Sequence, residues 1–165
     1  MIAVGKAATA MAQAAHDLFP TAPQLIVTKY DHGHGAPDDA EVIEAAHPVL
    51  DDNSLHAGRR VVDVVSQMPP GSHLMMLISG GASALAEAPE EGHDLHSLTA
   101  RAQALLASGA NIQTMNEARR QMSRIKGGKL LSRFCGDRVT TLCCCQRGRE
   151  PSSRPATPAG CAANA

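Results

Sequence analysis

Short apolar segments of strand length alternate with longer amphipathic or alanine-rich segments along this 165-residue chain. The segment 73–78 (HLMMLI) is a continuous apolar run, which is typical of a parallel strand buried on both faces. Four further strands are predicted, at residues 2–4, 25–28, 42–46 and 139–142. Helices are predicted for an alanine-rich stretch ending at residue 17 and for residues 51–65, 95–106 and 114–125. This alternation predicts an α/β fold with a mostly parallel sheet flanked by helices.

The composition narrows the class of protein only slightly. Hydrophobic residues make up 44% of the chain but aromatic residues only 2%, so the core must consist of aliphatic side chains and methionine. A net charge of -1 gives no reason to expect a nucleic-acid or membrane-surface partner. No apolar run approaches the roughly 18 residues that span a bilayer, and the amino terminus does not resemble a signal peptide. We therefore expect a cytoplasmic protein.

The last segment differs from the rest in composition. Residues 143–165 contain no Val, Leu, Ile, Phe or Met, so they cannot bury enough apolar surface to offset their ordering entropy. We expect a domain at residues 1–142 and a disordered tail at 143–165. A natural tail is one explanation, but we favour a frameshift, since suitable codons for the tail read in another frame as Val-Leu-Leu-Ser and Ile-Ala-Ser-Gly. The nucleotide sequence distinguishes the two explanations.

Two glycine turns follow predicted strands and are candidates for anion binding. Gly5-Lys6 leads from the first strand into a helix, whose free N–H groups and lysine charge suit a phosphate or carboxylate. Ser79, Gly80, Gly81 and Ser83 follow the strand at 73–78, where open α/β sheets bind ligands. The spacing is not that of a Walker A loop. Plain tight turns are the alternative interpretation of both segments.

A third candidate is a polar string near residues 116–129. It contains Asn116, Arg119, Arg120, Ser123, Lys126, Gly127, Gly128 and Lys129. The spacing of Asn116, Arg119 and Ser123 would place them on one helix face, and arginine suits carboxylate or phosphate recognition. A solvated basic helix end is the alternative. The eight histidines show no metal-ligand motif, so no metal site is predicted. His47 before Pro48 is interpreted as a residue that orients the backbone or as one at the edge of a site.

Taken together and in order, these motifs resemble the glycerate 2-kinase family, whose members are often labelled hydroxypyruvate reductase. The segments that carry the resemblance are AVGKAATAMA (3–12), VTKYDHG (27–33), AAHPVLDDNS (45–54), LISGGASAL (77–85) and SGANIQTMNEARRQMSRIKGGKL (108–130). The resemblance covers residues 1–142. It implies a Rossmann-like amino-terminal domain, here incomplete, that would pair with a carboxyl-terminal domain across the active-site cleft.

The resemblance also implies an activity and roles for residues. The expected reaction is ATP-dependent, Mg²⁺-dependent phosphorylation of D-glycerate, usually at the 2-hydroxyl. Lys6 matches the lysine of the family's GKA motif, which implies a catalytic role. The residues implied to bind substrate or phosphate are Ser79, Gly80, Gly81, Ser83, Asn116, Arg119, Lys126, Gly127 and Gly128.

The chain departs from the family pattern in ways that limit these expectations. Ala82 replaces the third glycine of the family's SGGGSAL loop, which would restrict the backbone if that position needs a positive φ. The family's segments after residue 142 and its carboxyl-terminal domain are missing, so we expect the chain to be inactive alone. Two alternatives remain: a hydroxypyruvate reductase using NAD(P)H, which the absence of a GxGxxG fingerprint disfavours, and a non-catalytic module that binds an anion or nucleotide.

Overall fold

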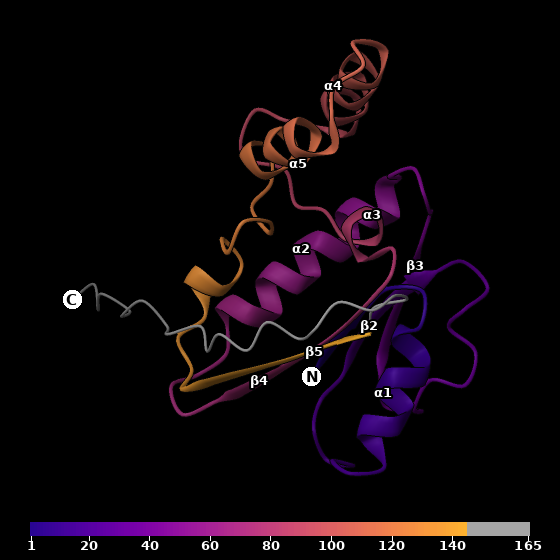
Figure 1. Ribbon diagram of the computed structural model, residues 1–165. Helices are drawn as coiled ribbons and strands as arrows, with labels where there is room; N and C mark the ends of the chain where they lie inside the picture. The colour runs from indigo at the N-terminus through magenta and orange to yellow at the C-terminus, as the bar shows by residue number, and fades with distance from the viewer. Residues whose placement is uncertain (145–165) are drawn as a thin grey trace.

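The computed structural model describes residues 1–144, without the side chain of Ile112, and these residues form one parallel sheet with helices on both faces (Figure 1). The strands lie in the order β3-β2-β1-β4-β5, and every neighbouring pair is parallel. Their bounds are β1 Ile2–Val4, β2 Leu25–Lys29, β3 Glu41–Ala45, β4 His73–Ser79 and β5 Arg138–Cys144. The α/β prediction is confirmed, and each predicted strand is present within two residues of its expected bounds.

The two faces of the sheet carry separate apolar layers. The alanine-rich helix α1 (Ala8–His16) packs on one face through small side chains, against Ile26 and Leu77. Helix α2 (Asp52–Ser66) packs on the other face, where Val61 and Val65 are buried with strand residues of β1, β2 and β4. Because side chains alternate along a strand, each central strand contributes to both layers. The core is mainly aliphatic, as the composition predicts, except that Phe134 is buried in it as well, and the sheet divides this core into two layers.

Helix α2 starts where the sequence predicts it. The side chain of Asp51 accepts a hydrogen bond of 2.8 Å from the backbone N–H of Ser54, and the Ser54 hydroxyl bonds the Asp51 backbone in return. This reciprocal capping box satisfies N–H groups that the first helical turn leaves free. The cap holds the loop between β3 and α2 at the edge of the sheet where the site residues gather.

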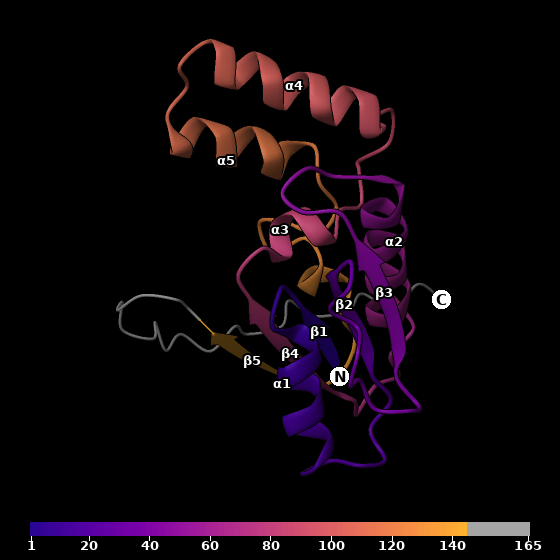
Figure 2. The same ribbon diagram turned by 90° about the vertical axis from the view of Figure 1, so that its right-hand side faces the viewer.

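A helical hairpin extends the fold beyond the sheet. It consists of α4 (Leu95–Ala107) and α5 (Ile112–Gln121), and Figure 2 shows the two helices lying side by side above the short helix α3 (Ala82–Leu85). Two antiparallel segments connect the hairpin to the body: the Glu90 N–H donates to Met122 O, and the Arg124 N–H donates to Ala88 O. A 3-10 helix, η1 (Leu131–Arg133), then leads the chain back to β5.

One predicted helix boundary is wrong. The helix expected at 114–125 starts earlier and ends at Gln121, because Ser123 forms a β-bridge with Pro89 and its hydroxyl bonds the buried carboxylate of Glu87. Ser123 therefore leaves the helix face that it was predicted to share with Asn116 and Arg119. The competing partner comes from 36 residues away in the sequence, where local periodicity gives no sign of it.

The last strand enters the segment that the sequence analysis assigned to the tail. Strand β5 continues through Cys143 and Cys144, which pair with Ile78 and Ser79 of β4. The remaining residues of the predicted tail, 145–165, lie outside the described residues.

Candidate functional site

The strand order creates a crevice between β1 and β4. The chain goes from β1 outward to β2 and β3, then crosses back to β4 on the other side of β1. At such a switch point, the connections leaving the carboxyl ends of the two strands diverge, and open α/β sheets bind ligands there. The residues that directly follow these strands are Gly5-Lys6 after β1 and Gly80-Gly81 after β4, so two of the three predicted motifs meet at this crevice.

Backbone contacts hold the two turns together. The Lys6 N–H donates to Gly80 O at 2.9 Å, and the Ala7 N–H donates to the buried Ser79 hydroxyl at 3.0 Å. Gly5 has a φ of 132°, and a Cβ on it would lie 2.2 Å from Ser79 Oγ. Glycine at residue 5 is therefore required by the close approach of the β4 turn, and Ser79 is a structural partner of the Lys6 turn.

Cationic groups surround the crevice. The Lys6 side chain is exposed, and within residues 1–144 its ammonium group has no ion-pair or hydrogen-bond partner. Burial lowers the pKa of His47 below its ordinary value, and the charges of Lys6 and Lys29 lower it further. Burial is the larger cause of this pKa shift, and the smaller contributions of Lys6 and Lys29 place two positive charges near the imidazole. The crevice is suited to an anion.

His47 belongs to this cluster, as the sequence analysis expected of a residue at the edge of a site. A Cβ built on Gly81 would lie 2.9 Å from His47 Cδ2 and 3.3 Å from Lys6 Cγ. Gly81 has a φ of 91° and is the residue before α3. The backbone at residue 81 thus lies close to both side chains, which brings the imidazole, the lysine and the loop together.

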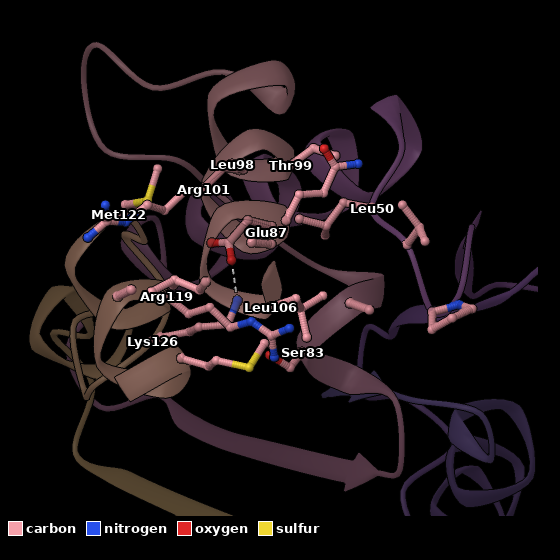
Figure 3. A pocket seen from close by; sticks show the side chains of 18 of the residues that line it. Leu50, Ser83, Glu87, Leu98, Thr99, Arg101, Leu106, Arg119, Met122 and Lys126 are labelled. Atoms are coloured by element: carbon pink, nitrogen blue, oxygen red, sulfur yellow. Dashed lines mark hydrogen bonds and ion pairs between the residues drawn. The ribbon is translucent and has the colours of Figure 1, made fainter. Parts of the chain in front are cut away.

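A pocket of about 540 Å³ opens beside this surface, between the hairpin and the loops that follow β3 and β4 (Figure 3). Of the predicted site residues, Gly81, Ser83, Arg119 and Lys126 line it. Its walls are mostly apolar side chains from α4 and α5, including Leu98, Leu106, Met115 and Met122. Cationic residues from the same helices, Arg101 and Arg119, also border it.

Lys126 is held by a buried carboxylate at the base of this pocket. Its ammonium group forms an ion pair with Glu87, whose side chain is 4% exposed, and Figure 3 shows this contact as a dashed line. The Ser123 hydroxyl donates to the other oxygen of the same carboxylate. The Ser123 oxygen in turn accepts the N–H groups of Ile125 and Lys126 at 3.2 Å each. This network fixes the segment 123–126 against the end of α3.

The remaining residues that were predicted to bind substrate or phosphate lie outside both the β1/β4 crevice and the pocket. Asn116 is exposed on α5 and does not line the pocket. Gly127 and Gly128 form an exposed turn with φ values of 67° and 85°, and they do not line it either. Ala82 adopts no positive φ and is the first residue of α3, packed against the core. Alanine in place of the family's third loop glycine therefore does not strain the backbone.

A second hollow, of about 400 Å³, lies on the other side of Lys6. It is bordered by Asp31 and by His32 and His34 of the loop after β2. The Glu44 carboxylate holds this loop by accepting the N–H groups of His32 and Gly33. Within the described part of the chain, no group of three or more histidine, cysteine, aspartate or glutamate side chains is placed to bind a metal ion.

Sequence reasoning missed Glu87 and Asp31. Glu87 lies between alanines directly after an apolar stretch, and an acidic residue in such a place is a signal of a buried, paired carboxylate. Within residues 1–144, Asp31 is the non-glycine residue that adopts a positive φ, 65°. Aspartate tolerates this conformation better than most residues because its short side chain can form local hydrogen bonds.

Comparison with known proteins identifies the family. Residues 1–145 match the family model described as "Domain of unknown function (DUF4147)". The chain belongs to this family. Its relatives include a D-glycerate 2-kinase of Thermotoga maritima, 40% identical over 144 residues, which cover 86% of this chain and 34% of the relative. A glycerate 2-kinase of Pyrococcus horikoshii is 37% identical over 142 residues, with 86% and 32% covered. The resemblance to the glycerate 2-kinase family is confirmed.

Other relatives of this DUF4147 chain carry a different name, and solved structures share the fold. An Agrobacterium vitis protein named "Putative hydroxypyruvate reductase" is 41% identical over 145 residues, covering 86% of this chain and 37% of that one. A crystal structure of glycerate kinase from Thermotoga maritima matches with a TM-score of 0.81 at 41% identity, covering 86% of this chain and 35% of that one. The chain thus spans about a third of the length of the relatives it matches.

Within residues 1–144 of this DUF4147 chain, no helix is long and apolar enough to cross a membrane.

Proposed function

We propose that this DUF4147 chain is the part of an ATP-dependent glycerate 2-kinase that binds the phosphates of the nucleotide, with the intact enzyme converting D-glycerate to 2-phosphoglycerate. The observation that carries the proposal is the exposed ammonium group of Lys6 at the β1/β4 crevice, which forms no ion pair within residues 1–144. The bond from the Lys6 N–H to Gly80 O holds this residue beside the Gly80-Gly81 turn. The curated relatives named as glycerate 2-kinases support the choice of reaction.

The chemistry of phosphoryl transfer suits these groups. In such reactions the protein mainly positions the reactants and stabilises negative charge on the transferred phosphoryl group. The Lys6 ammonium supplies a full positive charge, and the turn at Gly80 and Gly81 lets a phosphate approach the backbone without contacting a Cβ. Lys6 is the group assigned to contact the transferred phosphoryl group.

The site is compatible with magnesium carried by the nucleotide. Mg²⁺ in kinases is held mainly by phosphate oxygens and water, with one or two protein carboxylates. Asp31 borders the same hollow as Lys6 and is the carboxylate in position to contribute. The ion would neutralise charge on the phosphate oxygens. Asp31 would help to hold the ion, either directly or through a bound water.

The chain is expected to bind nucleotide without turning it over. It spans about a third of its relatives, and catalysis requires both reactants to be held within a fraction of an ångström of the productive geometry. For the isolated chain, this proposal therefore coincides with the alternative of a non-catalytic module that binds an anion or nucleotide. A nicotinamide-dependent reductase is less compatible with the site, since Gly5-Lys6-Ala7-Ala8 has one glycine where the dinucleotide fingerprint has three.

Calorimetric titration of the purified chain with Mg²⁺-ADP tests this proposal. Lys6→Gln should weaken binding by tenfold or more, because it removes the charge that faces the phosphates. Arg59→Gln is the matched control: Arg59 is exposed on α2, borders neither hollow, and should change affinity by less than twofold. Equal affinity of the wild type and the Lys6→Gln variant would contradict the proposal. Tight NADH binding unaffected by Lys6→Gln would favour the reductase.

A further inference from the structure

The pocket beside the phosphate site has the wrong chemistry for glycerate. Its volume is about 540 Å³ and most of its lining is apolar. Glycerate is a three-carbon acid with an oxygen on every carbon, so it presents almost no apolar surface. A pocket with such walls gains binding energy by removing apolar ligand surface from water, and glycerate offers little of it.

The walls suit a flat, uncharged heterocycle. Leu98 and Leu106 come from α4, and Met115 and Met122 come from α5 and its C-cap. Methionine sulfurs make favourable contacts with aromatic rings, and their flexible side chains adapt to a planar shape. Leu106 is 63% exposed within the described structure, so an apolar group on this surface remains open to solvent and available to a ligand.

The charges around the pocket suit a ligand that is apolar at one end and anionic at the other. Arg101 and Arg119 line the pocket, and within residues 1–144 neither forms an ion pair. Lys126 is neutralised by Glu87 and therefore adds no net charge. The pocket is continuous with the proposed phosphate site, because Gly81 lines it and also lies against Lys6. A nucleotide has this combination of an apolar base and a charged phosphate chain.

We infer that this pocket, between the α4–α5 hairpin and the loops after β3 and β4, receives the base of the nucleotide whose phosphates lie at Lys6. The inference rests on the proposed function and deepens it, since it assigns the nucleotide, and not glycerate, to the hairpin side of the crevice. The base is enclosed by the leucines and methionines of the hairpin. Glycerate is then left to the side of Lys6 that faces away from the hairpin.

The test compares ADP with pyrophosphate, which carries two phosphates but no base. Calorimetric titration of the 165-residue chain should give at least tenfold tighter binding for ADP. Leu106→Gln introduces no charge and should weaken ADP binding by fivefold or more, while pyrophosphate binding changes by less than twofold. Leu18→Gln is the matched control, because Leu18 is 74% exposed just beyond the end of α1, and it should affect neither ligand.

A second variant fills the pocket. Ala102 lies on α4, is half-buried and lines the pocket, so Ala102→Leu should block the base without removing a charge. It should weaken ADP binding and leave pyrophosphate binding unchanged, with the helix content of each variant checked by circular dichroism.

The outcomes separate this inference from the proposal on which it rests. If pyrophosphate binding depends on Lys6 while neither pocket variant affects ADP, the phosphate site stands and the base site is overturned. If the pocket variants weaken ADP while Lys6→Gln has no effect on either ligand, the base site stands and the phosphate site fails. If Leu106→Gln dissociates a dimer of the chain and leaves ADP affinity unchanged, the pocket is a protein interface and the inference is overturned.

Discussion

His47 and Gly81 approach each other so closely at the carboxyl edge of the sheet that a Cβ at residue 81 would lie 2.9 Å from the imidazole Cδ2. This close approach joins the loop after β3 to the loop after β4. It fixes the Gly81 backbone, with its φ of 91°, beside Lys6. The candidate site therefore depends on a glycine whose role is to let two neighbouring loops approach each other.

Gly81→Ala should destabilise the chain by about 1–3 kcal/mol, because alanine is strained at this positive φ and its methyl group displaces the His47 ring. Urea unfolding measures the change. Gly80→Ala is the control, since a Cβ there meets nothing within 4 Å and Gly80 has no positive φ. It should change the stability by less than about 1 kcal/mol. Equal effects of the two substitutions would show that the contact at residue 81 does not constrain the loop.

The pKa of His47 should respond to charge in the crevice. Burial and the charges of Lys6 and Lys29 hold it below its ordinary value, so Lys6→Gln should raise it part of the way back. Phosphate bound at Lys6 should raise it as well. NMR titration of the imidazole carbon protons measures both shifts, and a pKa unaffected by Lys6→Gln would place the lysine charge elsewhere.

The same pKa gives a direction for the pH dependence of stability. Since the folded pKa is lower than the unfolded one, the unfolded chain takes up the proton first as the pH falls through the ordinary histidine value. The His47 contribution therefore disfavours the native state increasingly below about pH 6.5, the reference histidine pKa, and is absent well above it. His47→Gln should reduce this part of the pH dependence in urea unfolding series.

Lys126 should matter more for stability than Lys129, although both form ion pairs with glutamates. Lys126→Met leaves the buried Glu87 carboxylate without its counter-charge, which should cost about 3–5 kcal/mol. Lys129→Met breaks a pair with Glu90 whose side chains are more than a third exposed, and should cost less than about 1 kcal/mol. Adding Glu87→Gln to Lys126→Met should recover much of the loss. Similar losses for both lysines, measured by urea unfolding, would contradict a buried role for Glu87.

The strands and the start of α2 were predicted well because the sequence patterns that indicate them involve only neighbouring residues. Residues 73–78 are a continuous apolar run, and Asp51 with Ser54 forms a cap that can be read from four consecutive residues. The end of α5 was missed because the partner of Ser123 is Glu87, which no local pattern connects to it. Helix α3 was missed because four residues are too few to show a helical period.

Part of the candidate site was predictable from signals that are equally local. The Lys6 turn and the Ser79–Gly81 loop each follow a strand, and two parallel neighbouring strands bring their carboxyl ends together. The pocket was not predictable, because its walls come from a hairpin whose position over the loops depends on the buried pairing of Glu87 with Lys126.

Amide NMR of the isotope-labelled chain, titrated with tripolyphosphate, shows whether Lys6 and the Gly80-Gly81 turn form one phosphate site. We expect the amide signals of Lys6, Ala7, Gly80 and Gly81 to shift together with a single affinity, and we expect Lys6→Gln to abolish the shifts. Shifts confined to other parts of the chain, or unchanged in the Lys6→Gln variant, would contradict a shared phosphate site.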